Sequence, residues 1–424
     1  MIILNETKEE RNIKLYPIYK MLSWDLLFYY SINFIFLTQV KGFSASEVLL
    51  AEAFYPFCKV LLLMPLTALA NKLGKRKSLI VANIVNVFSI LSYIIAQNLI
   101  YIFIGQLLSA IAYDIKGVVE TNLLYDSLPK NEKRGHMFSK IDGKGSSWYY
   151  YIDAVTSVAS GFLYVINGYL PFVLCLICCI ISTILSFKFE DISKPNQIKL
   201  STKQYYKDLK HSFRYMLQSN RLKLLFIFGS VFSALLSVLV SLRSGILEQI
   251  QVPEQYFGII FALLGMASGF TAKNQNRIHS KYRNKTLGVI SIPTAISCII
   301  LGFFVLGNLP FKVTIVLVLA MYLIQFIAKG AFYTLIRRYL NNFTTSSLRN
   351  KITSAYNLIE SLVRVLVALF ASWILKITTA SNAVLVIGCI STIFIVLLID
   401  IMKDKVGLKP EEYSKKEIEF LELH

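Results

Sequence analysis

The chain has 424 residues, of which 55% are hydrophobic and only 16% are charged, and its mean hydropathy is +0.57. A soluble domain needs more charged side chains to cover its surface, so the composition indicates a protein embedded in a lipid bilayer. The formal net charge is +19. The basic residues nevertheless fall in alternate loops and form no single basic face, so nucleic acid is not an expected partner.

Apolar stretches long enough to cross a membrane follow one another along the chain. A spanning helix needs about 20 apolar residues, and a helix is the default spanning form because lipid offers the backbone no hydrogen bonds. Short connections such as Gln97-Asn98 and Asn167-Gly168 predict antiparallel neighbours. The twelve predicted spans are 18–40, 46–70, 78–97, 100–124, 144–166, 170–188, 222–247, 256–273, 286–306, 312–336, 351–375 and 381–402.

Lysine and arginine are distributed unevenly between the loops. They crowd the loops after the second, fourth, eighth and tenth spans, whereas the opposite loops hold only Lys41, Lys312 and Lys376. Because basic loops stay on the cytoplasmic side, the pattern predicts a multi-pass protein of the cell membrane with both termini in the cytoplasm. An even number of spans agrees with that orientation.

One long polar interruption, 189–220, divides the chain. We expect an N-terminal six-helix bundle over 1–188, a C-terminal six-helix bundle over 221–406 and a cytoplasmic tail over 407–424. Apolar residues recur at helical spacing within the interruption: Tyr206, Leu209, Phe213 and Met216. This basic linker is either an amphipathic helix on the cytoplasmic membrane surface or a partly ordered segment.

The turn between the second and third spans carries a recognisable motif. Leu69, Ala70, Gly74, Lys75 and Arg76 fit the pattern G-x-L-A-D-R-x-G-R-K, and Lys72 takes the place of its first arginine, while Thr67 replaces the first glycine and Asn71 replaces the aspartate. The turn resembles the loop between the second and third helices of the major facilitator superfamily. The resemblance implies an all-α membrane protein of twelve helices in two halves, with a gating loop formed by Asn71, Lys72, Gly74, Lys75 and Arg76.

A narrower resemblance lies at the junction of the fourth and fifth spans. Leu123-Leu124-Tyr125-Asp126-Ser127-Leu128 closes one span, and Phe138-Ser139-Lys140-Ile141-Asp142-Gly143 opens the next. The pair is similar to that of a bacterial subgroup of the superfamily described as drug or small-molecule exporters. It implies a fold more firmly than it implies a substrate.

Charged residues within the spans are candidates for substrate binding and proton coupling. A charge near the bilayer centre costs about 2.5–3.5 kcal/mol on insertion scales, so such groups usually face a protein interior or an aqueous cavity. Asp25, Asp114 and Asp153 lie on spans that line or flank the central cavity in the superfamily. Burial disfavours the charged form of an acid and a cation such as Lys59 favours it, a balance that proton coupling requires. The alternative for each acid is a fixed structural pair.

The second half contributes three further candidates: Lys329, Glu360 and Arg364. Glu360 precedes Arg364 by four residues on one predicted helix, which is the favourable order for an ion pair. Lys116 and Glu120 share that spacing in the reverse order. Mutual neutralisation without a transport role is the structural interpretation of both pairs.

Other chemistry is missing from the sequence. It holds no P-loop, no zinc-binding histidine pattern and no Ser/His/Asp arrangement, and all six cysteines lie in apolar segments. We therefore expect no enzyme activity, no cofactor, no metal and a monomer. The predicted function is secondary transport of a small organic solute by alternating access, with a substrate site between the halves and proton-coupled efflux by antiport. The alternatives are proton-coupled uptake by symport, or a sensor or scaffold with a degenerate transporter fold.

Overall fold

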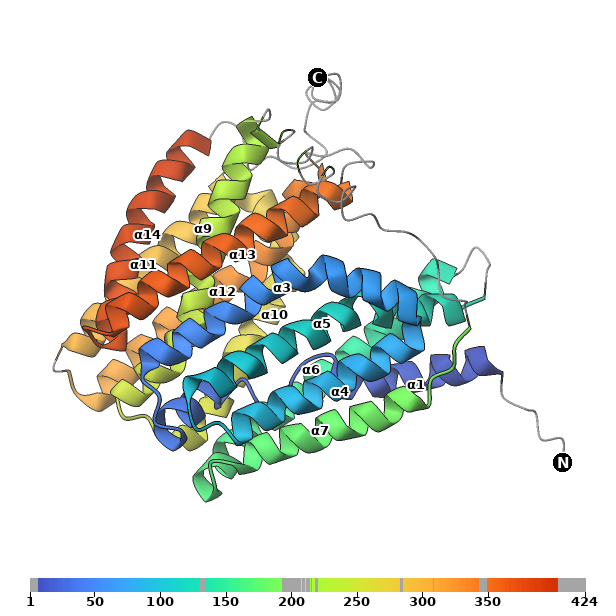
Figure 1. The fold of residues 1–424 in the computed structure, drawn as a ribbon. Coiled ribbons are helices and arrows are strands. Elements are labelled where there is room, and N and C mark those ends of the chain that lie inside the picture. The colour runs from blue at the N-terminus through green and yellow to red at the C-terminus, as the bar shows by residue number, and fades with distance from the viewer. Residues whose placement is uncertain are drawn as a thin grey trace. The chain divides into compact units, whose positions relative to one another are not determined.

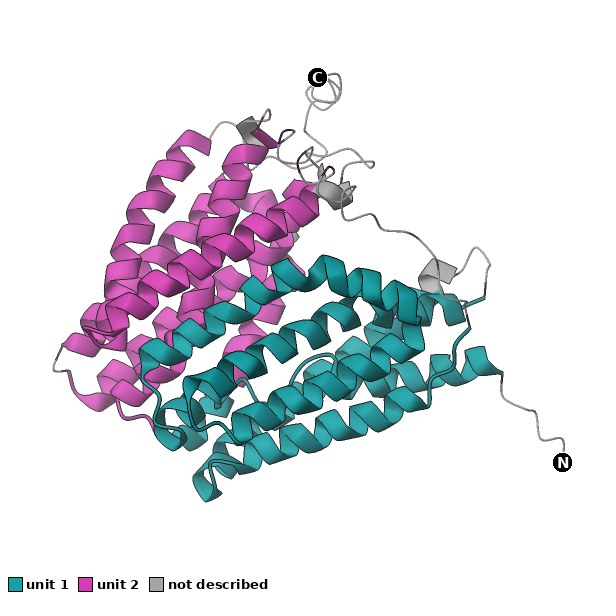
Figure 2. Cartoon of the chain, viewed as in Figure 1, with its two compact units in different colours: residues 1–200, 254–259 teal, residues 201–253, 260–424 magenta. Residues whose placement is uncertain are grey.

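The chain folds almost entirely into helices, as a computed structural model shows (Figure 1). The structure describes residues 7–129, 134–192, 207, 210, 214, 216–217, 220–282, 285–307, 309–342 and 349–402. They form two compact units, residues 1–200 with 254–259 (unit 1) and residues 201–253 with 260–424 (unit 2), coloured separately in Figure 2. Most of the predicted linker over 189–220, and all of the predicted tail over 407–424, lie outside the described residues.

Unit 1 begins with local signals that fix its helix starts. Thr7 and Glu10 form a reciprocal capping box at the first helix, and Ser44 and Glu47 form another at the third, which satisfies amide groups that have no partner within the helix. The helices are α1 (Lys8–Ser23), α2 (Asn33–Ile35), the π-helix η1 (Phe36–Val40), α3 (Ala45–Leu73), α4 (Lys75–Ile94), α5 (Leu99–Ser127), α6 (Arg134–Ile166) and α7 (Leu170–Phe187). The short 3-10 helix η2 (Glu254–Tyr256) is also assigned to unit 1.

The rest of the described chain continues the alternation of long helices and short turns. Its helices are α9 (Asn220–Gln249), α10 (Phe257–Tyr282), α11 (Thr286–Leu306), α12 (Phe311–Asn342), α13 (Arg349–Leu375) and α14 (Ala380–Met402). By length and composition, ten helices among the described residues are apolar enough to cross a membrane. The predicted spans without such a helix are 18–40, which is broken, and 144–166, which lies within the longer and more polar α6.

The same helix pairings occur within each unit. In unit 1, α1 packs against α6, and α4 packs against both α5 and α7. In unit 2, α9 packs against α13, and α11 packs against both α12 and α14. Small residues allow the close approaches: a Cβ at Gly302 on α11 would lie only 2.6 Å from the Cβ of Leu385 on α14. Each unit is therefore a helical bundle built on one packing scheme.

The first predicted span is not one continuous helix. We expected a helix over 18–40, but α1 ends at Ser23, residues 24–32 form turns, and helical structure resumes at Asn33. Phe28 has a φ of 64°, a value that a helix does not contain, and the Asp25 side chain accepts a hydrogen bond from the amide of Leu26. Local hydrogen bonding by Asp25 and the left-handed Phe28 are the physical reasons for the break.

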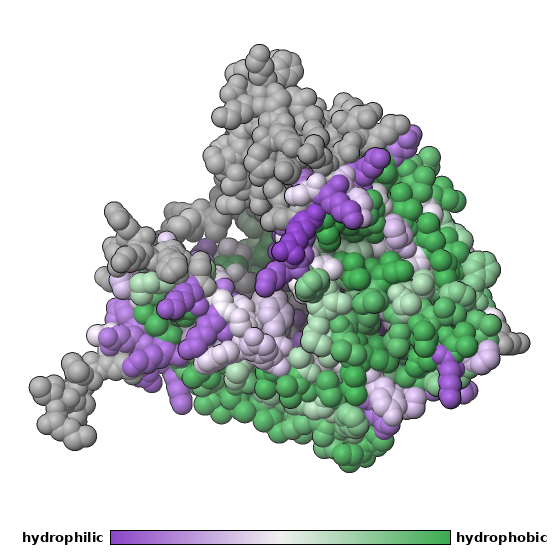
Figure 3. All heavy atoms as spheres, turned by 180° about the vertical axis from the view of Figure 1, so that it is seen from behind, coloured by the Kyte–Doolittle hydropathy of each residue, from purple (hydrophilic) through white to green (hydrophobic). Residues whose placement is uncertain are grey.

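The outward faces of the helices are apolar. Among the most exposed large side chains are Ile166, Leu366, Val316, Val155 and Phe303, each more than 60% accessible. Figure 3 shows broad hydrophobic areas on the face that it draws. Exposed apolar surface of this extent fits contact with lipid, which confirms the all-helical membrane fold expected from composition.

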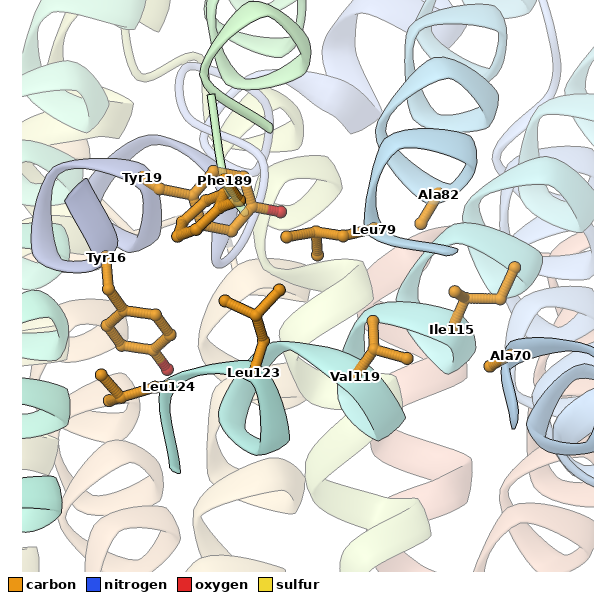
Figure 4. Packing of buried hydrophobic residues seen from close by; sticks show 10 residues of the cluster. All are labelled: Tyr16, Tyr19, Ala70, Leu79, Ala82, Ile115, Val119, Leu123, Leu124 and Phe189. Atoms are coloured by element: carbon orange, nitrogen blue, oxygen red, sulfur yellow. The ribbon is translucent and has the colours of Figure 1, made fainter. Parts of the chain in front are cut away.

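The best defined part of the core of unit 1 lies where four helices meet (Figure 4). It joins Tyr16 and Tyr19 of α1 with residues of α3, α4 and α5, and with Phe189 beyond α7. The Tyr19 and Phe189 rings meet edge to face, with centroids 5.3 Å apart. The remaining members of the cluster are Ala70, Leu79, Ala82, Ile115, Val119, Leu123 and Leu124.

Candidate functional site

Asp114 is the most buried of the predicted acids. It lies on α5 and is 4% exposed, and its Oδ1 is 3.8 Å from Lys59 Nζ on α3. That separation exceeds hydrogen-bond distance, so the attraction between the two charges is not reinforced by a hydrogen bond. Among the described residues, the buried Asp114 Oδ2 has no hydrogen-bond partner. The carboxylate is thus held by one long contact to a lysine whose side chain is 39% exposed.

Asp25 lies in the break of the first span, directly after α1. Its Oδ1 accepts hydrogen bonds from the Leu26 amide at 2.9 Å and from the Tyr30 hydroxyl at 2.6 Å. The side chain is half-buried. Asp25 therefore has firm hydrogen-bond donors, unlike Asp114, and its first role in the structure is to organise the turn in which it lies.

Aromatic side chains connect the three predicted acids of unit 1. The Trp24 ring packs edge to face on Tyr149 and Tyr150 of α6, with centroids 5.0 and 5.3 Å away, and both Asp25 and Asp153 lie near enough to act electrostatically on these tyrosines. Tyr55 on α3 lies near both Asp25 and Asp114, and Lys59 Nζ is 5.6 Å from the centre of its ring. Asp25 thus lies near two sets of rings: Tyr149 and Tyr150, which Asp153 also approaches, and Tyr55, which Asp114 and Lys59 also approach.

Lys116 and Glu120 make no direct ion pair among the described residues, although each charge acts on the other. Lys116 Nζ donates instead to the carbonyl of Ser23 at 2.8 Å, at the end of α1, where the partial negative charge of the helix favours a cation. Glu120 is 7% exposed, and its Oε1 has no hydrogen-bond partner in the described chain. The break in the first span frees a carbonyl for Lys116, which sequence spacing alone cannot reveal.

The ion pair predicted from the spacing of Glu360 and Arg364 is present on α13. Arg364 Nη2 lies 2.8 Å from Glu360 Oε1, and it also donates to the Ser233 hydroxyl of α9 and to the Tyr333 hydroxyl of α12. Ser233 in turn donates to Glu360 Oε1. Lys329 lies one helical turn before Tyr333 on α12 and is half-buried. The polar cluster of unit 2 therefore draws on three helices.

The turn at Gly74 joins α3 to α4. Gly74 has a φ of 87°, which favours glycine, and it is both the C-cap of α3 and the N-cap of α4. Lys75 pairs with Asp126 of α5, and the Arg76 guanidinium donates to the Phe187 carbonyl of α7 at 2.9 Å. Asn71, half-buried, and Lys72, exposed, belong to the last turn of α3. The two sequence motifs thus meet, because Asp126 belongs to the segment that closes α5.

Sequence reasoning missed a second buried ion pair in unit 1. Lys20 Nζ on α1 lies 2.5 Å from Asp142 Oδ1 on α6, and the Tyr16 hydroxyl donates to the same oxygen at 2.7 Å. Lys20 is 4% exposed. Two signals pointed to this contact: Lys20 lies inside the predicted span 18–40, and Asp142 lies inside the motif that opens the fifth span.

Comparison with known proteins agrees with this architecture. The Major Facilitator Superfamily model matches residues 21–318. The crystal structure of the nucleoside transporter NupG has a TM-score of 0.72 at 12% identity, over 96% of this chain and 100% of that chain. A D-xylose-proton symporter has a TM-score of 0.67 at 12% identity, with 95% and 98% covered. A POT family transporter in complex with 5-aminolevulinic acid has a TM-score of 0.64 at 14% identity, with 94% and 95% covered.

No curated protein matches the chain. At identities of 12–14% the structural likenesses establish the fold alone. The family match covers more than half of the chain, and it confirms the expectation of a multi-pass membrane protein that is not an enzyme. The chain belongs to the major facilitator superfamily, whose members are secondary transporters of small solutes.

Proposed function

We propose that the protein exports a small organic solute in exchange for protons, and that Asp114 is the residue that binds and releases the proton. The observation that carries this proposal is the state of Asp114: a carboxylate 4% exposed, with one oxygen 3.8 Å from Lys59 and the other without a hydrogen bond in the described chain. A coupling group must be able to exist both charged and neutral inside the protein. Burial favours the neutral form and Lys59 favours the charged form, so the two influences oppose each other.

The other acids are less suited to this role. Asp25 accepts two short hydrogen bonds, which hold its carboxylate in the turn. Glu360 is bonded to Arg364 at 2.8 Å, and removing its charge would break that pair. A change of protonation at Asp114 disrupts no comparable contact.

Export as the direction of transport is supported by the resemblance of Tyr125-Asp126-Ser127 and its neighbouring segment to those of drug and small-molecule exporters. The Lys75–Asp126 pair fits that proposal, since it joins this segment to the gating turn. Uptake by symport is the alternative, and it uses the same coupling residue. The solutes named for the compared structures are a nucleoside, D-xylose and 5-aminolevulinic acid. They support a small polar or amphipathic solute as the cargo.

The test of coupling uses proteoliposomes with an imposed pH gradient and a panel of solutes of matched size: benzoate, benzamide and benzylamine. We expect wild-type protein to move one of them against its gradient. Asp114→Asn should abolish that uphill movement and leave downhill exchange measurable. Glu9→Gln, an exposed acid on α1, is the matched control and should behave as wild type. Uphill transport by Asp114→Asn with an unchanged pH dependence would reject Asp114 as the coupling residue, and Asp25, Asp153 and Glu360 would be tested next.

We further propose that both termini and the linker over 189–220 face the cytoplasm, and that two six-helix halves lie on either side of that linker. The basic loops support this orientation. Ser280 at the end of α10 and Thr379 before α14 are exposed and are predicted to lie on opposite sides of the membrane. In a cysteine-free background, an impermeant maleimide added to intact cells should label Thr379→Cys and spare Ser280→Cys. The reverse pattern would invert the topology.

A further inference from the structure

One face of α12 is aromatic with a lysine in its middle. Tyr322, Phe326, Lys329 and Tyr333 follow one another at intervals of four, three and four residues, which places them on the same side of the helix. The contacts show where this face points. The Tyr322 hydroxyl donates to the Arg243 carbonyl of α9 at 3.1 Å, and Tyr333 accepts from Arg364 of α13 at 2.8 Å. Lys329 therefore lies between two residues that contact α9 and α13.

The charged groups around Lys329 are positive. Lys329 Nζ lies 5.2 Å from the centre of the Phe326 ring, and Arg243 Cζ lies 5.7 Å from the same centre. Two cations thus share one ring, and their separation cannot exceed the sum of those distances. Arg364 Cζ lies 5.9 Å from the Tyr333 ring, one helical turn along α12. Arg243 and Arg364 are both near enough to repel the charge of Lys329.

The acid nearest to this cluster, Glu360, is already paired with Arg364. Glu360 Oε1 is bonded to Arg364 at 2.8 Å and to the Ser233 hydroxyl, so it neutralises the arginine of its own helix. In the described part of the chain, Lys329 makes no hydrogen bond and no ion pair. Its ammonium group lies instead over the Phe326 ring. A half-buried ammonium group inside a membrane protein is costly without an anion beside it. The missing partner is a negative group.

We infer that Lys329, together with Arg243 and Arg364, binds the carboxylate or phosphate of a small organic anion, and that organic anions are the class of solute the protein carries. The inference rests on the proposed transport of a small solute. Tyr333, which is half-buried beside Arg364, offers an aromatic ring to an apolar or aromatic body. An anionic group meeting two or three cations in a low dielectric forms charge-assisted hydrogen bonds, which are stronger than neutral ones.

The depth of Lys329 favours a solute over a lipid headgroup. At 1.5 Å per residue, Lys329 is about 27 Å along α12 from its first residue and about 20 Å from its last. The phosphates of a bilayer lie at the membrane surface, near the ends of a spanning helix and not near its middle. A lysine at mid-helix is reached more readily by a solute that enters the protein.

The test measures binding to the purified full-length protein in phosphatidylcholine nanodiscs at constant ionic strength. The probes are benzoate, phenyl phosphate, benzamide and benzylamine, and apparent affinity is taken from the shift of the melting midpoint with concentration. We expect benzoate or phenyl phosphate to stabilise the wild type, and benzamide and benzylamine to have no effect. Lys329→Met should weaken the anion effect about tenfold or more, as expected for the loss of a charged hydrogen bond. Lys329→Arg should retain it.

The matched control is Lys312→Met, an exposed lysine at the start of the same helix, which should bind as wild type does. Stabilisation by benzamide or benzylamine equal to that by benzoate would overturn the inference. So would an anion effect that survives Lys329→Met, or the absence of any anion effect on the wild type. A second arm adds phosphatidylglycerol to the nanodiscs without a probe. Stabilisation by that lipid which disappears in Lys329→Met would assign the site to a headgroup and reject the solute.

Transport in proteoliposomes separates this inference from the proposed function. Anion binding that depends on Lys329, with downhill but no uphill transport of an anionic probe, would leave the inference intact and reject proton-coupled export. Uphill transport of benzylamine or benzamide, with no anion binding, would support the proposed function and reject the anion site.

Discussion

Among the described residues, the buried ion pairs of unit 1 join different helices, whereas the Glu360–Arg364 pair of unit 2 joins two positions of one helix. In unit 1, Lys20 of α1 meets Asp142 of α6, and Lys59 of α3 approaches Asp114 of α5. In unit 2, Glu360 and Arg364 pair along α13. The two units share one packing scheme, but their buried charges differ. In the described chain, unit 1 has acid oxygens without a hydrogen bond, on Asp114 and Glu120, whereas unit 2 has Lys329 near two arginines.

The difference indicates that buried ion pairs contribute differently to the stability of the two units. A pair between helices fixes how those helices pack, so its loss affects the stability of the bundle. The Glu360–Arg364 pair by itself joins no two helices, and α13 is linked to α9 and α12 at this point through the neutral hydroxyls of Ser233 and Tyr333. Variants of the two kinds of pair therefore test this contrast between the units.

The largest effect is expected at the buried pair between α1 and α6. Lys20→Met leaves Asp142 without its cation, and breaking a buried pair costs about 3–5 kcal/mol. We expect the lower end, about 3 kcal/mol of unfolding free energy, because the Asp142 side chain is 25% exposed. Thermal melting of the purified protein measures it, with Lys8→Met on the exposed part of α1 as the control. A loss of stability in Lys20→Met no greater than that in Lys8→Met would mean that the pair between α1 and α6 does not stabilise unit 1.

The next effect concerns the turn at Gly74. A valine there must adopt a φ of 87°, a strained conformation that costs about 1–3 kcal/mol. Gly42→Val is a closely matched control, because Gly42 has a φ of 75° and open space around its Cα. Both variants should melt earlier, but only Gly74→Val should lower transport per molecule, since Gly74 precedes the Lys75–Asp126 contact. Equal transport by the two variants would show that the turn serves the fold alone.

The pair on α13 should matter less for stability. Arg364→Met removes hydrogen bonds to Ser233 and Tyr333 together with the pair to Glu360, and we expect a loss of about 1–2 kcal/mol. The side chain is 29% exposed, which keeps the cost below that of Lys20→Met. Melting of the two variants side by side tests the order, with Arg337→Met on α12 as an exposed control. A larger loss for Arg364→Met would reverse the comparison of the units.

The smallest effect is expected at the exposed pair of unit 1. The Lys75 and Asp126 side chains are 31% and 29% exposed, and pairs of this kind contribute about 0–1 kcal/mol and weaken as salt is added. Lys75→Gln should therefore lower the melting midpoint slightly in low salt and not at all in high salt. Lys77→Gln, an exposed neighbour on α4, should change neither. A salt-independent loss would mean that the pair is shielded from solvent.

The sequence predicted the elements of the fold more fully than their local geometry. Apolar length locates a helix, but it does not mark its ends: α6 begins at Arg134, ten residues before the predicted start at 144, because polar residues continue a helix beyond the bilayer. The break after Ser23 could not be predicted, since it depends on the φ of Phe28 and on hydrogen bonds to Asp25.

The candidate site was predicted in part for the same reason. Glu360 and Arg364 lie on one helix, so spacing alone identified their pair. Spacing could not reveal that Lys116 donates to the Ser23 carbonyl, which is available only where α1 ends. Contacts between helices depend on rotation and register, which a single sequence does not define.

The break in the first span has a mechanical consequence. Side chains of α5 and α6 donate hydrogen bonds to backbone carbonyls in and beside the break. Lys116 donates to Ser23, Ser160 to Phe28 at 3.2 Å, and Tyr164 to Ile35 at 3.2 Å. An unbroken helix transmits torque from end to end, but residues 24–32 lack the regular ladder that would carry it. We therefore expect residues 24–32 to be the hinge at which the first span bends, while Lys20 holds α1 to α6 and Ser160 and Tyr164 hold Phe28 and Ile35 to the same helix.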